Sequence, residues 1–158
     1  MSNTDTNLLE VYKLYVTSTE KVTTWRQNAN TFFVSLNTII LGLQQLFSSD
    51  KNISNILIII VPIAGVFLSV IWLFLIISFK KLNSAKYQVI HEIESQMEST
   101  LGVKPYAKER QILNANSSKF PYFSLTSIER QVPVIFAFLH LFTLTYYTYK
   151  IVTNLSIF

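Results

Sequence analysis

The residues best suited to chemistry include two histidines and the carboxylates near one of them. His91, Glu94 and Glu98 recur at helical spacing, which would bring an imidazole and two carboxylates toward one metal ion. A zinc-binding helix of the HExxH kind carries a second histidine one turn on, and this run does not. We therefore expect a solvated helix face here, with no metal site and no other cofactor.

His140 is the only ionisable residue well inside an apolar segment. An ionisable side chain within a membrane is a candidate for function. The competing interpretation, which we favour, is a neutral histidine that is hydrogen-bonded to a neighbouring helix. The chain has no cysteine, no Gly-rich phosphate loop and no Ser/His/Asp order typical of a nucleophile, so we predict no catalytic residues and no enzyme.

Amides recur along the otherwise apolar segment 30–47. Asn30, Asn37 and Gln44 are spaced by seven residues, as along one seam of a coiled coil. On a helix they share, with Thr38, the half opposite the large apolar side chains. Amides cannot face hydrocarbon cheaply, so this polar face, with which we group His140, must meet other helices or water. Hydrogen bonding between helices, a water-lined cavity or pore, and a helix that never crosses the membrane all stay open.

The longest apolar stretch, Ile53–Phe79, indicates a transmembrane helix. It has no ionisable side chain between Ile56 and Ile77, and a bilayer core about 30 Å thick needs roughly 20 apolar residues to cross. Gly65 and Ser69 form a small-xxx-small pair that lets another helix approach closely, and Pro62 predicts a local kink.

A third apolar segment runs from Val132 to about Tyr149 and follows a capping box at Thr126–Glu129. With 30–47 and 53–79 it makes three predicted transmembrane helices. Charged residues are only 14% of the chain, against roughly 25% in soluble domains. The fold class is therefore all-α: an integral membrane protein with helical extensions outside the bilayer.

The chain divides into four predicted parts. They are an N-terminal helix (1–28), a transmembrane hairpin (29–79), a soluble helix and loop segment (80–131), and the third span with the C-terminus (132–158). We expect residues 1–7 to be frayed and one helix to run from about Leu8 to Phe47. A second helix is expected over Asn83–Leu101, with an apolar stripe that packs on neighbouring protein. From Gly102 to Tyr122 we expect irregular chain.

Charge sets the predicted orientation. Basic residues concentrate in 80–131, whereas the turn 48–55 carries one, so the N-terminus and 80–131 are expected in the cytoplasm. The net charge of +4 fits contact with membrane lipids, not nucleic acid, because no basic cluster is interleaved with aromatic residues. The predicted interface anchors are Trp25, Arg26, Lys80, Lys81, Tyr146 and Tyr147.

Several short motifs together resemble one family. They are Tyr12 and Tyr15 ahead of Arg26–Asn30, then Phe32-Phe33 and Asn37, Leu82–Lys86 leading into Val89–Glu94, Pro105-Tyr106, and Ile128-Glu129 with Val132-Pro133 and Phe136. Over Tyr12–Phe136 the chain resembles the RipA family of octameric bacterial membrane proteins. The resemblance implies a homo-octamer in the bacterial cytoplasmic (inner) membrane and identifies no catalytic residue.

Three hypotheses of function follow. The first is a non-enzymatic homo-oligomer whose polar face turns toward the inter-subunit or central space, as a scaffold or a pore. The second is a membrane-disrupting effector of a bacterial anti-phage defence system, with Gly102–Phe120 sensing a signal or docking a cytoplasmic partner. The third is a lipid-active enzyme at the inner face that uses His91 and Glu94.

Overall fold

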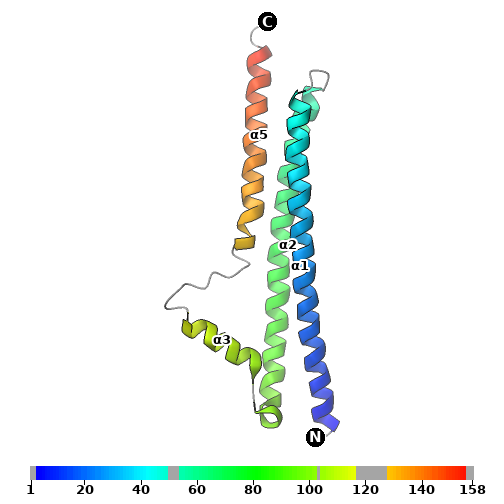
Figure 1. Ribbon diagram of the computed structural model, residues 1–158, viewed down its shortest axis with the longest axis vertical. Coiled ribbons are helices and arrows are strands. Elements are labelled where there is room, and N and C mark those ends of the chain that lie inside the picture. The colour runs from blue at the N-terminus through cyan, green and yellow to red at the C-terminus, as the bar shows by residue number, and fades with distance from the viewer. Residues whose placement is uncertain (1–2, 50–53, 103, 117–127, 156–158) are drawn as a thin grey trace. The chain divides into compact units, whose positions relative to one another are not determined.

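The computed structural model of the 158-residue chain describes residues 3–49, 54–102, 104–116 and 128–155. Its helices are α1 (Asn3–Ser49), α2 (Asn55–Leu101), α3 (Pro105–Asn116) and α5 (Gln131–Leu155) (Figure 1). Every element in these ranges is helical, which confirms the all-α prediction. Three of the helices, α1, α2 and α5, are long and apolar enough to cross a membrane.

The two long helices are continuous. The prediction that one helix runs from about Leu8 to Phe47 is confirmed, and α1 in fact begins at Asn3, so the expectation of a frayed lead is wrong for residues 3–7. In the same way α2 passes through Lys80 and Lys81 without a break, with Pro62 inside it. The second predicted span and the predicted helix over 83–101 are therefore a single element.

The expectation of irregular chain from Gly102 to Tyr122 is wrong for its first part, because Pro105–Asn116 forms α3. Gly102 ends α2 with a φ of 62°, a left-handed conformation that glycine adopts at no steric cost. Pro105 then starts α3, where a missing N–H is not needed. Residues 117–127, with Thr126 and Ser127 of the predicted capping box, and residues 50–53 of the predicted turn lie outside the described residues.

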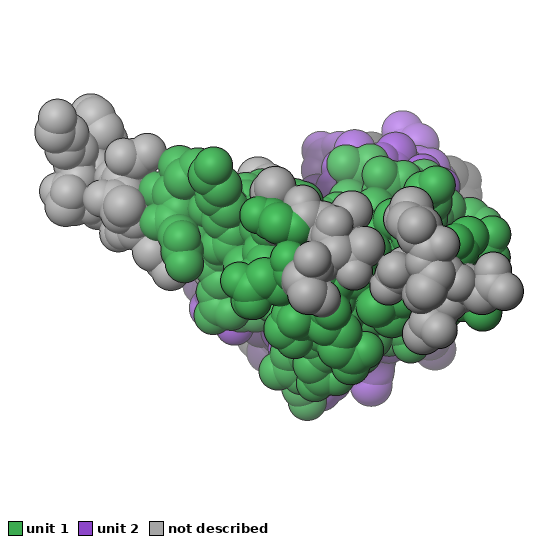
Figure 2. Space-filling model, turned by 90° about the horizontal axis from the view of Figure 1, so that it is seen from below, with its two compact units in different colours: residues 1–27, 78–125 green, residues 28–77, 126–158 purple. Residues whose placement is uncertain are grey.

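The chain folds as two compact units, coloured separately in Figure 2. Unit 1 comprises residues 1–27 and 78–125, and unit 2 comprises residues 28–77 and 126–158. In unit 1 the start of α1 runs antiparallel to the end of α2, and the predicted apolar stripe of α2 is buried there at Ile90, Ile93 and Met97.

In unit 2, parts of α1 and α2 lie beside α5 (Figure 1). An apolar cluster of Phe33, Trp72 and Ile76 forms its core. Positions that face inward recur every seven residues, which is the spacing of helices that pack in a left-handed supercoil. The inward residues are Asn30, Asn37 and Gln44 on α1, Ile58, Pro62, Gly65, Ser69, Trp72 and Ile76 on α2, and Pro133, His140 and Tyr147 on α5.

Candidate functional site

Polar side chains meet at the centre of unit 2. The carbonyl oxygen Oδ1 of Asn37 accepts the Ser69 hydroxyl at 3.0 Å and lies 3.0 Å from Nε2 of His140. Because Oδ1 is an acceptor, Nε2 of His140 must carry the proton. The Asn37 amide nitrogen donates to the Phe33 carbonyl at 2.8 Å, and Ser69 also donates to the Gly65 carbonyl at 2.9 Å. Asn37 thus links all three helices.

Gly65 makes this meeting of helices possible. A Cβ added at this glycine would collide with three atoms of the His140 ring. The imidazole therefore occupies the space that any other residue would fill with its own side chain. Asn37 and His140 are both 0% exposed and Ser69 is 1% exposed, so water does not reach the cluster from outside the subunit.

Two further polar contacts lie on either side of this cluster. Trp72 donates its indole N–H to Oδ1 of Asn30 at 2.9 Å, and its ring stacks on Phe33 with 5.8 Å between centroids. Farther along α5, the Tyr147 hydroxyl donates to the Ser48 hydroxyl at 2.9 Å. Together with the Asn37 cluster these contacts form what we call the buried seam.

Gln44 belongs to the buried seam by position but not by bonding. It is 1% exposed, and within the described part of the chain neither its amide nitrogen nor its amide oxygen has a hydrogen-bond partner. Gln44 and Asn37 both face other helices of the same chain. This placement differs from the expected one, in which the amides turned toward an inter-subunit or central space. The reason is that α5 supplies His140 and closes over them.

Thr38 does not join the buried seam. It is exposed, and its hydroxyl donates to the Val34 carbonyl of its own helix at 2.8 Å. The heptad register separates it from its neighbour Asn37, because adjacent residues on a helix point about 100° apart. The polar half of this helix, which the sequence presented as one face, is therefore two faces in the structure.

The residues expected to anchor the membrane interface differ in their placement. Trp25 is 57% exposed and Tyr146 is 52% exposed, while Lys80 and Lys81 are exposed as well. Arg26 is half-buried. Tyr147 is buried within unit 2, where its hydroxyl donates to Ser48.

Unit 1 holds a second polar centre around Glu94. This carboxylate is 2% exposed, so the expectation of a solvated face at His91–Glu98 is wrong for this residue. Its oxygens accept the backbone N–H groups of Tyr106 at 2.9 Å and Ala107 at 3.2 Å, and the Tyr12 hydroxyl at 3.2 Å. Glu94 thus caps the N-terminus of α3, where helix N–H groups lack partners and negative charge is favourable.

The surroundings of Glu94 also change a neighbouring phenol. Burial, followed by the nearby Glu94 charge and the hydrogen bond to it, raises the pKa of Tyr12 to about 12. His91 lies 3.4 Å from Glu94 through Nδ1. No group of three or more potential metal ligands occurs among the described residues.

A groove lies between α2 and α3 within unit 1. It has a volume of about 560 Å³, and each helix contributes one face to it. Tyr87 and Tyr106 meet in it, with ring centroids 5.7 Å apart. Its remaining lining is mainly polar: Ser84, Gln88, His91, Glu109 and Arg110, with Leu113.

Comparison with known proteins places the chain in a family. The sequence model of the octameric membrane protein family matches residues 9–149. The chain belongs to this family. The match covers most of both units, and the buried seam and the capped α3 both lie within it. A search of curated proteins and a search of solved structures each found no match.

Membership confirms the expectation of a membrane protein from an octameric family, with three helices able to span the bilayer. Self-association is the property that the family description carries. An octameric membrane protein needs helix contacts of two kinds, within each subunit and between subunits. The buried seam supplies contacts within the subunit, because it joins α1, α2 and α5 of one chain.

Proposed function

We propose that eight copies of the protein form a closed ring in the bacterial cytoplasmic membrane, and that this ring is a scaffold and not a conducting pore. Copies that share one membrane orientation are related by axes normal to the membrane. Eight such copies close into a cyclic ring in which each subunit contacts its neighbours through two different faces. The excess of basic residues in 80–131 supports a cytoplasmic N-terminus and cytoplasmic unit 1.

The burial of Asn37, Gln44 and His140 carries the proposal against a pore. Each of these three side chains is 1% exposed or less within one subunit, whereas Thr38 and Gln45 of α1 stay exposed. No ionisable side chain lies between Arg26 and Asp50 or between Lys51 and Lys80. Rings of charged side chains are one common lining of ion channels, and these two segments supply no charged side chain. We infer that the central space of the ring is filled by lipid.

Two measurements test the scaffold. The native mass of the protein in mild detergent should be that of an octamer. Vesicles that contain the octamer should retain a trapped fluorescent dye and potassium as well as empty vesicles do. If the octamer releases either solute, the scaffold proposal fails. A change of that release in Gln44→Leu would then assign the pore to the seam, because no described side chain loses a partner in this variant.

A second candidate function is favoured by the groove of unit 1. The groove offers tyrosine rings and an arginine beside a helix that Glu94 holds in place. Such a surface suits a cytoplasmic partner or signal, as the hypothesis of a membrane-disrupting defence effector requires. Overexpression should then arrest growth with loss of membrane potential, and Arg110→Ala should change the toxicity. Growth at the control rate would remove this candidate. We propose no lipid-active enzyme, because the Glu94 carboxylate it would use caps α3.

A further inference from the structure

The outer face of α1 in unit 2 carries a row of small and polar residues. We call it the outer stripe, and its members alternate by three and four positions along the helix and are all exposed. A face that meets only lipid tails would gain nothing from such residues, whereas helix interfaces in membranes are enriched in them. The outer stripe consists of Asn28, Thr31, Ser35, Thr38, Gly42 and Gln45.

Gly42 is the most informative member of the outer stripe. A Cβ added there would meet no atom within 4 Å, so nothing inside the subunit requires a glycine. Gly65 provides the contrast, because the His140 ring of the same subunit fills its Cβ space. Glycine in the interior of a helix is destabilising relative to alanine. The close approach of another backbone or side chain from outside the subunit would give Gly42 a physical reason.

The polarity of the outer stripe fits packing better than a water channel. The Thr38 hydroxyl donates to the Val34 carbonyl at 2.8 Å, so its hydrogen bond is made within α1. A hydroxyl that bonds back to its own helix presents mainly its methyl group and a shallow surface to a neighbour. Small side chains of this kind leave room for large side chains of a neighbouring helix.

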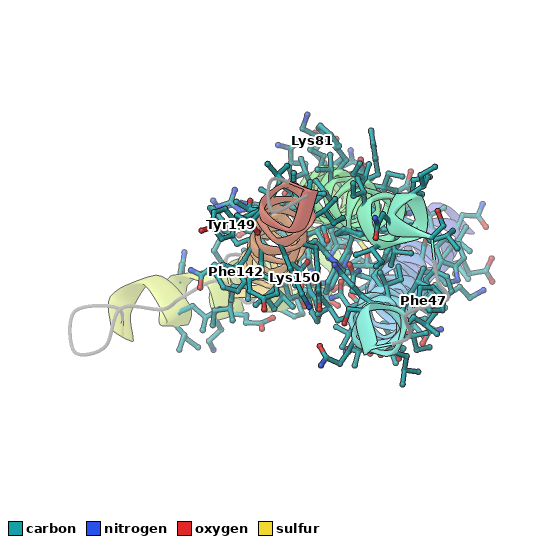
Figure 3. All side chains as sticks on the ribbon, turned by 90° about the horizontal axis from the view of Figure 1, so that it is seen from above. Phe47, Lys81, Phe142, Tyr149 and Lys150 are labelled. Carbon is teal, nitrogen blue, oxygen red and sulfur yellow. The ribbon has the colours of Figure 1, made fainter. Side chains whose placement is uncertain are left out.

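Large side chains project from α5 at a similar spacing. Ile135, Phe138, Phe142 and Tyr149 are 56%, 67%, 71% and 69% exposed, and we call them the aromatic ridge. In Figure 3, Phe142 and Tyr149 lie on the side of α5 that faces away from Phe47 of α1. Phe142 and Tyr149 therefore project away from the end of α1 in their own subunit.

We propose that the aromatic ridge of one subunit packs into the outer stripe of the next subunit around the octamer. This inference rests on the proposed ring, which needs two different complementary faces for each subunit. The outer stripe on α1 and the aromatic ridge on α5 are two such faces. The second copy is the occupant that an octameric family supplies.

The contacts inside unit 2 give the register of this interface. Asn37 meets His140, and Phe33 and Phe136 both contact Trp72, so α1 and α5 run parallel with these pairs at equal depth. Rotation about an axis normal to the membrane preserves depth. Ser35 of one subunit should therefore lie opposite Phe138 of the next, about half a helical turn from each of those pairs.

Cysteine cross-linking tests the register directly, because the chain has no native cysteine. Full-length protein with Ser35→Cys and Phe138→Cys should give, after oxidation in membranes, a ladder of linked species that ends at the octamer. Ser35→Cys alone and Phe138→Cys alone should give monomers, whereas the two single variants expressed together should give linked dimers. A Ser35→Cys variant that dimerises by itself would show like faces meeting, which overturns the inference.

A packing variant with a matched control completes the test. Gly42→Leu should abolish the octamer in mild detergent, whereas Ala64→Leu, at an exposed position of α2, should leave it intact. Circular dichroism should report equal helix content in both variants. An octamer that survives Gly42→Leu and yields no Ser35–Phe138 cross-link overturns this interface but leaves the proposed ring. Failure of the wild-type protein to form an octamer overturns the ring itself.

A membrane-impermeant thiol reagent separates packing from a water channel. Ser35→Cys in the intact octamer should react no faster than Ile39→Cys, an exposed apolar position on the same helix. Rapid labelling at Ser35→Cys alone would place the outer stripe against water and would overturn the packing inference.

Discussion

Replacing Asn37 by leucine should destabilise unit 2 by about 1–3 kcal/mol, which is the cost of leaving one buried polar group without a partner. The structure identifies that group. Ser69 keeps its bond to the Gly65 carbonyl when Asn37 is lost, whereas His140 Nε2 loses its one acceptor among the described residues. Hydrogen bonds between membrane helices average about 0.6 kcal/mol, so the lower half of the range is the better expectation.

Unfolding of the detergent-solubilised protein by sodium dodecyl sulfate, followed by circular dichroism, measures the change. Gln44→Leu is the matched control, because Gln44 is equally buried on the same helix and no described side chain loses a partner with it. The double variant Asn37→Leu with His140→Leu should recover part of the loss, since both members of the pair are then apolar. Equal stability of Asn37→Leu, Gln44→Leu and the wild type would refute the reasoning.

Four further outcomes are expected. Gly65→Val should prevent α5 from docking, because the His140 ring occupies the space of the new side chain, and intramembrane proteolysis or cross-linking between α2 and α5 would detect this. Trp72→Phe should lose the bond to Asn30 and cost about 1 kcal/mol in the same unfolding assay; stability equal to that of the wild type would contradict it. Glu94→Ala should free α3 and speed limited proteolysis between Gly102 and Asn116, while Glu92→Ala, an exposed acid two residues away, should not. The folded state holds the Tyr12 proton more tightly than the unfolded state, so this contribution to stability is complete below pH 10 and is lost as the pH rises toward 12; Tyr12→Phe should remove that part of the pH dependence.

Much of the fold follows from patterns that have one physical solution. An apolar run as long as Ile56–Ile77 has to be a helix in a membrane, and the absence of a breaker between Leu8 and Phe47 predicts the continuous α1. The lysine pair at 80–81 indicates where apolar surroundings end, but charge does not stop a helix. For that reason the continuity of α2 could not be read from composition.

The site was harder to predict because its geometry depends on the third helix. Spacing by seven grouped Asn30, Asn37 and Gln44 correctly, and Gly65 and Ser69 marked a close approach. Only the position of α5 decides whether that face is inside or outside the subunit. Trp72 was missed, although it lies seven residues from Gly65 and its indole N–H needs an acceptor when buried.

Glu94 was misjudged for a related reason. Acids on a helix near other charges are usually solvated, and nothing local in His91–Glu98 distinguishes one carboxylate from the next. What distinguishes Glu94 is the start of α3, whose N–H groups reach it from Tyr106 and Ala107. Proline is favoured at the first position of a helix, so Pro105 is the one local signal of α3 and of its need for a cap.

The buried seam also imposes an order on biogenesis. Synthesis completes the hairpin of α1 and α2 before α5, which alone contributes His140 and Tyr147. Until α5 arrives, Asn37 keeps only the partners that α1 and α2 supply, and the face of α1 that carries Asn37 and Gln44 is not yet covered. A chain that stops before α5 would therefore leave this face of α1 exposed within the bilayer. A completed subunit covers this face and becomes fit to join a ring.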